Sequence, residues 1–581
     1  MDMPVFFTFI SRMQSVKLWQ RVGLGFLYAG LLWFGFARVQ AVPLTFDDPS
    51  ITGFIDTTLT ASAAMRVKSV NRTGDTVVAT GTQTVFPDAG DIYSSPLSAL
   101  SDIGLQKDNY GFFTRLSYIY DYTIMRQDCS NCERPTPGPS VAGIASGAPR
   151  PDGIANDAQD TAGNKFRVLD FFVYGQWNIG EHPLNVRVGK QVINWGESNI
   201  LGGGISQMQN PVDLGKTTTP GTEVKETLMP QQSVYTSYGL TDSLTVEAYY
   251  VYKWYRSVFF PVGTLFNPGD VLGEGYNPDL IPGVAFGGSD EPADSGQWGI
   301  ALHKIIESWN DADLGIYWVR SDAFAPYIGY FPNEAHPLYG PGDTQLGVYK
   351  WLYAENQDSY AVSLSGEVPG DLGLSFQTEV NYRPEFYDTR QCQNFSGIAG
   401  FATRGVFPNV LVPGCGIKNS DTWTFLGSLT KSFGTQLFGA DKMNLVFDVN
   451  AEWIENLDKG DPTDRRQPRA LNDRGNFGGV DGLDRPITPF SWGYAAVAGL
   501  EYNNFFSNIN MNPTFVFVHN VEGYQPFQAG AMVEEQRVAR VSVLFTYLTR
   551  SSLELGYSKW IGSAGLNEDK DNVSAIFKYS F

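Results

Sequence analysis

The sequence predicts an all-β fold, a transmembrane antiparallel β-barrel of the outer-membrane type, from three observations. First, the chain of 581 residues is rich in Gly (62) and in aromatic residues (Phe 39, Tyr 29, Trp 13), whereas only 18% of it is charged and its mean hydropathy is −0.18. Second, apolar and polar residues alternate over stretches of ten or more positions, the length that a tilted strand needs to cross a bilayer. Third, the connections mostly alternate between short and long. Strands that show one face to lipid and the other to water have this mixture.

A cleaved secretory signal peptide is predicted for residues 1–41. Three basic residues come first: Arg12, Lys17 and Arg21. The apolar stretch 22–37 that follows is shorter than the ~20 residues of a spanning helix, and Val39 and Ala41 are the small residues before the cut. A retained anchor is the alternative. We expect the mature chain, 42–581, to be a single barrel that begins at Val42.

Eighteen strand candidates follow, and bacterial barrels have an even number of strands. They span 53–66, 92–106, 110–124, 166–179, 183–193, 231–239, 243–254, 297–306, 312–321, 351–367, 371–384, 421–433, 442–454, 491–503, 507–519, 534–549, 551–560 and 571–581. The candidate 92–106 alternates least, so sixteen strands is the alternative.

The last strand alternates up to the final residue of the chain. In "NVSAIFKYSF" one face carries Val573, Ala575, Phe577, Tyr579 and Phe581. A strand of this kind closes a barrel against the first strand and leaves no unpaired edge. Its end, with Tyr579 and Phe581, also resembles the terminal signal that the barrel assembly machinery reads.

The long connections are predicted to lie outside the cell, with both termini periplasmic. They span 125–165, 194–230, 255–296, 322–350, 385–420 and 455–490. All four cysteines lie in them, and two loop disulfides, Cys129–Cys132 and Cys392–Cys415, are the expected pairing in an oxidising compartment. A zinc site or a redox CxxC motif is the alternative, but the four histidines are scattered.

The strands direct a polar set of mixed sign toward the lumen. The predicted lumen-lining residues are Arg115, Asp121, Arg187, Gln191, Glu247, Lys253, Gln377, Glu379, Arg383, Asp448, Glu452 and Glu554. Such a lining suits either a water-filled pore or a channel plugged by a polar segment.

The loop 194–230 is predicted to fold into the lumen as a gate or constriction. Its turn-forming and charged residues are Trp195, Gly196, Glu197, Gly202, Gly203, Gly204, Pro211, Asp213, Pro220 and Gly221. Gly takes positive φ and Pro fixes turns, as a loop packed against a wall requires. The alternative is an ordinary outer loop in which Trp195 belongs to the interfacial girdle.

Catalytic and cofactor signals are nearly absent, and we expect no enzyme and no cofactor. The chain has no G-x-S-x-G, HExxH or P-loop motif. The acidic runs 457–464 and 567–572 lack EF-hand spacing, so loop Ca²⁺ is only a weak alternative to solvated charge. A net charge of −20 makes nucleic acid an unsuitable partner.

The stretch "RVGKQVINWGES", with "QNPVD" and "PGTEVKE", resembles an outer-membrane family labelled domain of unknown function 1302. The matching residues are Arg187, Gly189, Lys190, Gln191, Trp195, Gly196, Glu197, Ser198, Asn210, Pro211, Asp213, Pro220 and Gly221. The first strand, "IDTTLTASAAMR", and the closing strand are similar too, whereas 67–91 departs from the family pattern and leaves the second strand in doubt.

The resemblance implies transport. Members of that family tend to be encoded beside periplasmic carrier-like proteins and inner-membrane exporters that handle lipids. By analogy, this barrel would conduct a hydrophobic or lipid-like substrate, in contact with outer-membrane lipid and lipopolysaccharide, in a Gram-negative bacterium. The alternatives are a polar-solute porin and, more distantly, a structural or enzymatic barrel.

Overall fold

The computed structural model describes most of the chain after residue 41. The described ranges are 42–70, 85–129, 153–198, 200–267, 273–275, 284–331, 347–370, 372–388, 418–434, 437–455, 488–525, 532–562 and 568–581. The predicted signal peptide therefore lies outside the described residues, and cleavage before Val42 stays a prediction. Within these ranges, no helix has both the length and the apolar character to cross a membrane.

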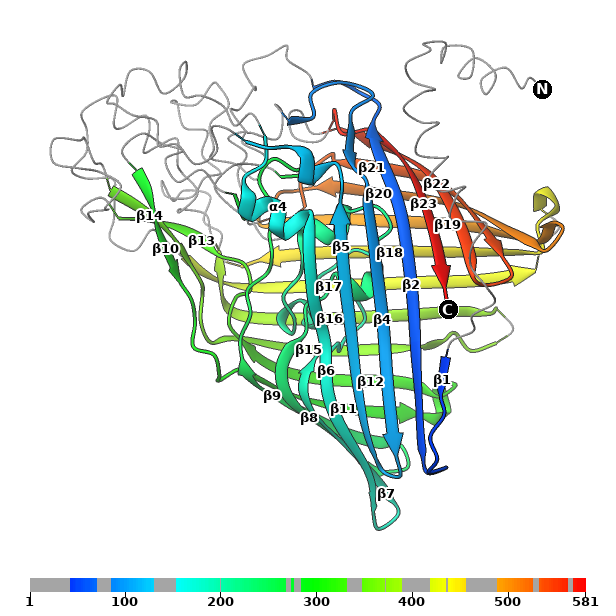
Figure 1. Ribbon diagram of the computed structural model, residues 1–581. Helices are drawn as coiled ribbons and strands as arrows, with labels where there is room; N and C mark the ends of the chain where they lie inside the picture. The colour runs from blue at the N-terminus through cyan, green and yellow to red at the C-terminus, as the bar shows by residue number, and fades with distance from the viewer. Residues whose placement is uncertain are drawn as a thin grey trace.

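Eighteen antiparallel strands close into a barrel (Figure 1). In order around the wall they are β2 (Ile51–Arg66), β4 (Pro96–Lys107), β5 (Tyr110–Asp121), β6 (Asn164–Ile179), β7 (His182–Gln191), β8 (Gln231–Thr241), β9 (Leu244–Lys253), β11 (Trp298–Ile306), β12 (Ala312–Ser321), β15 (Gln357–Glu367), β16 (Leu374–Asp388), β17 (Lys418–Gly434), β18 (Lys442–Ile454), β19 (Phe490–Phe506), β20 (Ile509–Glu522), β21 (Arg537–Tyr547), β22 (Ser551–Ile561) and β23 (Asn572–Ser580). Every predicted strand overlaps one of these, so the strand number is confirmed and sixteen is wrong.

The last strand closes the barrel against the first, as its alternation predicts. Strand β23 pairs with β2 from Thr58↔Ser580 to Arg66↔Asn572. Phe581 and Thr57 then exchange two backbone hydrogen bonds of 2.7 and 2.9 Å. In Figure 1 these strands, blue and red, lie side by side.

Two short strands extend the pairing of β2. Strand β1 (Val42–Leu44) pairs with Gly53–Ile55, beyond the end of β23. Strand β3 (Ile92–Ser94) pairs with the opposite end of β2, so the predicted strand 92–106 is in fact two strands, β3 and β4.

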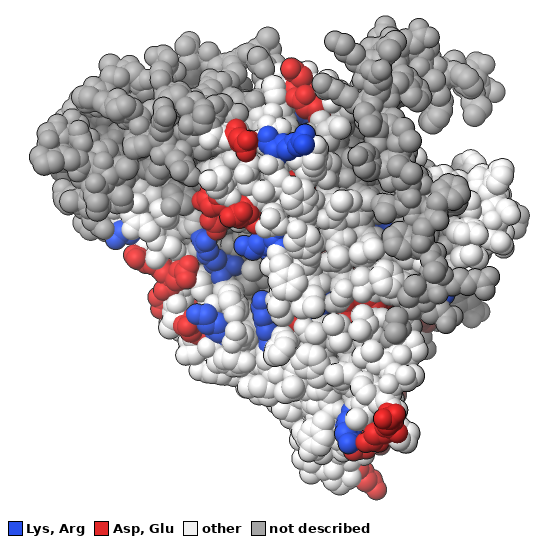
Figure 2. All heavy atoms as spheres, viewed as in Figure 1, with Lys and Arg blue, Asp and Glu red and all other residues white. Residues whose placement is uncertain are grey.

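The outer face of the wall is apolar and carries an aromatic belt near the long connections. Aromatic residues pair in register across six neighbouring strands: Trp318, Tyr360, Tyr382, Trp423, Trp453 and Phe490. Between the ends of the strands, large exposed side chains such as Val380, Phe447 and Val541 cover the same face. On the face seen in Figure 2, charged side chains gather on the left-hand part and at the lower tip, where short turns lie, and the right-hand part of this face is largely uncharged. An apolar band with an aromatic girdle is the outer surface of an outer-membrane-type barrel.

The connections contain elements that alternation does not predict. A separate sheet joins β10 (Val284–Asp290), β14 (Gly347–Leu352) and β13 (Tyr327–Phe331), with β10 parallel to β14. Short helices are α4 (Asn156–Ala162), α5 (Leu214–Thr218), η2 (Ile124–Arg126), η4 (Ile205–Met208), η5 (Val224–Glu226), η6 (Glu307–Trp309) and η7 (Leu437–Gly439). Three of these, η4, α5 and η5, lie in the 194–230 segment.

Candidate functional site

The 194–230 segment contacts side chains on the inner face of the wall. On β16, for example, Glu379, Asn381 and Arg383 are buried and alternate with the exposed Val380, which lies on the outer face. Hydrogen bonds and ion pairs join the segment to such inner-face side chains on β2, β4, β5, β6, β9, β16, β18 and β23. One segment is therefore tied to strands on several sides of the barrel.

The first group of ties centres on Glu379 of β16, whose side chain is only 1% exposed. One carboxylate oxygen accepts from the backbone N–H of Glu197 (3.0 Å), and the other accepts from the N–H of Ile205 (2.6 Å). Hydrogen bonds from two neutral backbone donors to an ionised acceptor are stronger than neutral ones. Glu379 therefore clamps both ends of the loop 197–205.

Glycines allow this clamp to form. Gly196 (φ +84°) and Gly204 (φ +65°) precede the two N–H donors and have a backbone conformation that favours glycine. A Cβ atom at either position would lie 2.3–2.4 Å from an oxygen of Glu379. Two of the predicted gate glycines thus let the backbone approach the carboxylate.

Neighbouring side chains complete this group, which we call the glutamate anchor: Glu379, Arg383, Asp448 and Asn450. Arg383 donates to the carbonyl oxygen of Gly204 (2.9 Å). On β18, Asp448 accepts from the N–H of Ile200 (2.6 Å), and Asn450 donates to the carbonyl oxygen of Gly202 (2.6 Å).

Trp195 is an internal residue of the site. It is buried, and its indole N–H donates to Glu247 of β9 at 2.7 Å. Its ring packs against Tyr249 and Tyr317, with centroids 5.0 and 6.1 Å away. The alternative that placed Trp195 in the interfacial girdle is therefore wrong.

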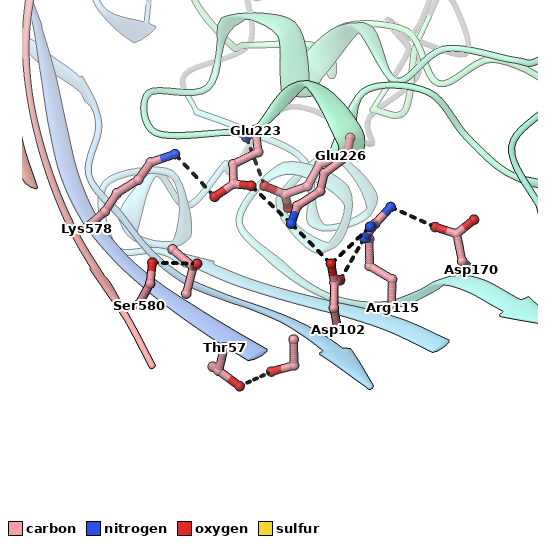
Figure 3. Close-up of polar contacts among 11 residues, drawn as sticks. Thr57, Asp102, Arg115, Asp170, Glu223, Glu226, Lys578 and Ser580 are labelled. Atoms are coloured by element: carbon pink, nitrogen blue, oxygen red, sulfur yellow. Dashed lines mark hydrogen bonds and ion pairs between the residues drawn. The ribbon is translucent and has the colours of Figure 1, made fainter. Parts of the chain in front are cut away.

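A second group, which we call the ion-pair anchor, holds the other end of the segment (Figure 3). It consists of Asp102, Arg115, Asp170 and Lys578 from the wall, with Glu223 and Lys225 from the segment. Arg115 makes two hydrogen bonds to Asp102 (2.8 and 3.0 Å) and a third to Asp170 (3.0 Å). Lys225 reaches Asp102 and Glu223, both at 3.3 Å, and Lys578 of β23 reaches Glu223 at 3.5 Å.

Beside the ion-pair anchor, helix η5 inserts Glu226 among buried partners. Glu226 accepts from Ser117 of β5 (2.6 Å) and pairs with Lys216 (3.5 Å), and it forms a capping box with Glu223. Burial alone would raise the pKa of Glu226, but Lys216 and the hydrogen bonds outweigh it and lower that pKa. At the other end of the segment, burial raises the pKa of Glu197.

The middle of the segment lies against β6 and β2. Asp213 pairs with Arg167 of β6 and caps helix α5 through the N–H of Lys216. The carbonyl oxygen of Pro220 accepts from Ser62 of β2 (2.7 Å). Two of the other predicted gate residues lie nearby. The carbonyl oxygen of Pro211 accepts a hydrogen bond from the N–H of Met229, and Gly221 (φ +86°) packs against side chains of β2.

The predicted lumen-lining residues fall into three groups. Five bind the segment or its anchors: Arg115, Glu247, Glu379, Arg383 and Asp448. Four occupy inner-face positions elsewhere: Arg187, which lies over the ring of Tyr235, Glu554, which pairs with Arg540, and Gln377 and Glu452.

The remaining three lie on the inner-face side of the alternation, but their partners are not in the segment. Asp121 is fully buried and accepts from Ser94 and from backbone N–H groups at the end of β5. Gln191 is buried and donates to the carbonyl oxygen of Ser233 (3.1 Å), and Lys253 pairs with Asp294 at the exposed rim.

Sequence reasoning missed Asp102, Asp170, Lys216, Glu226 and Asn450 as site residues. Asn450 follows the same alternation as Asp448 and could have been found by it. Asp102 lies in the strand with the weakest alternation, and Lys216 and Glu226 lie on short helices with no periodic signal.

Metal and disulfide predictions remain largely outside the described residues. Within the described ranges, no group of three or more His, Cys, Asp or Glu could hold a metal ion. The acidic run 457–464 is not described, and in the run 567–572 Asp569 pairs with Arg66 (3.2 Å). Of the cysteines, the described ranges include Cys129 alone, so both predicted pairings stay predictions.

Several solved outer-membrane proteins resemble the chain in structure. A BenF-like porin from Pseudomonas fluorescens Pf-5 has a TM-score of 0.43 and 10% identity, over 91% of this chain and 98% of that one. OccAB4 from Acinetobacter baumannii has a TM-score of 0.41 and 10% identity, over 92% and 100%. OpdK from Pseudomonas aeruginosa, solved with vanillate, has a TM-score of 0.40 and 10% identity, over 91% and 98%.

No curated protein matches the sequence. The model of one protein family matches residues 23–581, and its description is "Protein of unknown function (DUF1302)". The match covers both the barrel and the segment that its inner face holds, and the chain therefore belongs to the DUF1302 family.

Proposed function

We propose that this protein is an outer-membrane channel for small polar solutes and that the 194–230 segment forms its constriction. One observation carries the proposal: a single segment is bound to inner-face side chains on eight wall strands. A barrel of 16–18 strands is wide enough for an aqueous channel, so a segment bound across it narrows the passage.

A polar solute fits the inner face better than a lipid does. The inner face carries buried and half-buried charges of both signs on β4, β5, β6, β16 and β18, and the segment adds Glu223 and Lys225. A lipid chain would require a continuous apolar surface, which these charges interrupt. The hydrophobic conduit implied by the family resemblance therefore has less support, and so does the coupling to a carrier and an exporter.

The remaining parts of the proposal concern location and assembly. An apolar outer band with an aromatic belt supports a Gram-negative outer membrane. We place the short turns, and with them both ends of the barrel, on the periplasmic side. Recognition of Tyr579 and Phe581 by the barrel assembly machinery remains part of this proposal, as do contacts with lipopolysaccharide.

Single-channel recording in planar bilayers tests the proposed function. Deleting residues 200–209 removes the loop that Glu379 clamps and should raise the conductance severalfold. Val380→Thr, on the outer face of β16, is the control and should leave the conductance unchanged. Liposome swelling with graded sugars, set beside a lipid-binding assay, separates the two substrate classes. Wild-type conductance in the deletion variant, or lipid binding without sugar entry, would contradict the proposal.

A further inference from the structure

An aliphatic surface covers part of the inner face, between the two anchors. Its members occupy inner-face positions on four neighbouring strands: Val446, Ala495, Val497, Val516, Val518 and Val538. They adjoin in register, with the pairs Val446↔Val497, Val497↔Val516, Ala495↔Val518 and Val518↔Val538. We call this set the valine arc. Ala495 also pairs with Asp448, which fixes the arc on the same face as the glutamate anchor.

The 194–230 segment is tied to the wall on both sides of the valine arc. Ile200 and Gly202 bind β18 on one side, and Glu223 binds Lys578 of β23 on the other. Strands β19, β20, β21 and β22 lie between these two attachment sites in the order of the wall. Apart from the fully buried Ala495, the side chains of the arc are half-buried, so they keep contact with open space.

The segment itself exposes apolar groups beside its attachment points. Val224 is 82% exposed although Glu223 and Lys225, on either side of it, are bound to the wall. Ile200 is 37% exposed, and a Cβ at Gly202 would meet nothing within 4 Å. Open space therefore borders the segment near Ile200 and Gly202 and again at Val224.

Charge borders the arc on one side. Arg540 of β21 pairs in register with Val516 and makes an ion pair of 2.7 Å with Glu554 of β22. Both side chains of this pair are about one third exposed, so a solute can reach either of them. A polar or charged end of a solute thus has a binding partner next to an aliphatic surface.

We propose that the passage runs between the valine arc and the 194–230 segment, and that it selects small organic solutes with an apolar body and a charged end. This inference rests on the proposed channel function. The arc takes up the apolar body, because contact with aliphatic side chains removes apolar surface from water. The Arg540–Glu554 pair faces the charged end. A solute that is hydroxylated throughout gains nothing at the arc.

The test compares hexanoate with gluconate, two carboxylates with six carbons and one charge. In planar bilayers, reversal potentials under an anion gradient give their permeability ratio. In the wild-type channel, this ratio should exceed the ratio of their mobilities in water severalfold. The double variant Val516→Thr/Val518→Thr keeps the side-chain shape but adds hydroxyls, and it should bring the ratio close to the mobility ratio. Val541→Thr on the outer face of β21 is the matched control and should keep the wild-type ratio.

The outcomes separate this inference from the proposed function. A wild-type protein that conducts no KCl would contradict the proposed channel function itself. Normal KCl conductance with a hexanoate-to-gluconate ratio equal to the mobility ratio overturns the valine arc as a selective surface. A raised ratio that the double variant leaves unchanged overturns it as well, because selectivity then arises elsewhere.

Discussion

The two anchors hold the same segment by different chemistry. In the glutamate anchor, a buried carboxylate and buried polar side chains bind the backbone of the segment. In the ion-pair anchor, side chains bind side chains (Figure 3). Lys225, which pairs with both Asp102 and Glu223, is 37% exposed. The first lies on β16 and β18, and the second lies on β4, β5, β6 and β23.

This difference predicts how each end of the segment responds to its surroundings. A buried carboxylate that loses its donors costs several kcal/mol, so the glutamate anchor is either fully formed or broken. In the ion-pair anchor, the pairs that Lys225 and Lys578 make with Glu223 are about one third exposed, and each contributes only ~0.2–1 kcal/mol, which weakens as salt screens it. We therefore expect a segment that is fixed at 196–205 and adjustable at 223–225.

The largest expected effect comes from breaking the glutamate anchor. Glu379→Ala removes two charge-assisted hydrogen bonds, each worth about 1.5–3 kcal/mol. Single-channel conductance should rise severalfold and become noisy. Glu367→Ala, at the exposed end of β15, is the control. A Glu379→Ala channel with wild-type conductance would show that this anchor does not hold the constriction.

A second variant tests the close backbone approach at the same anchor. Gly204→Ala places a Cβ about 2.3 Å from Glu379 at a φ of +65°, so we expect a cost of about 1–3 kcal/mol and a partly raised conductance. Gly202→Ala is the matched control, because a Cβ there meets nothing within 4 Å. Equal conductance in Gly204→Ala and Gly202→Ala would contradict the close approach of the backbone to Glu379 as a requirement for the constriction.

Acidification should weaken the binding of the segment at Glu226 and relieve an energetic cost at Glu197. The pKa of Glu226 is lowered from 4.5, so its contribution is present above that value and is lost as the pH falls through the lowered pKa. The pKa of Glu197 is raised, so its charged form is the disfavoured one, and acidification removes a cost at that end. Conductance should therefore rise below pH 4.5, and Glu226→Gln should remove the rise. A rise that survives in Glu226→Gln would assign it to another group.

The smallest expected effect concerns the ion-pair anchor. Lys225→Met removes a half-exposed cation worth up to about 1 kcal/mol. In the wild-type channel, raising the KCl concentration should increase fluctuations of the open-channel current by more than the higher conductivity of the solution explains. The variant should show the same fluctuations already at low salt. Lys107→Met, which removes an exposed pair with Asp48, is the control. Identical salt dependence in all three proteins would remove the distinction between the anchors.

Alternation predicted the wall because each strand faces lipid and water in turn. It also predicts that Glu379, Arg383, Asp448 and Arg115 lie on the inner face. Their partners depend on which strands and turns meet in space, which no local period encodes. For this reason Lys216 and Glu226, on short helices inside the segment, were missed, as was the small sheet formed by β10, β13 and β14.

Oxidative cross-linking of the segment to the wall tests the central claim most directly. The Gly203→Cys/Asn450→Cys double variant joins positions where a Cβ on Gly203 lies 3.8 Å from Cγ of Asn450, within reach of a disulfide. Peptide mass spectrometry of protein oxidised in intact outer membranes should find the two introduced cysteines linked to each other. Free introduced cysteines, with the one at position 203 labelled in intact cells by a reagent too large to enter the channel, would contradict a segment held across the lumen.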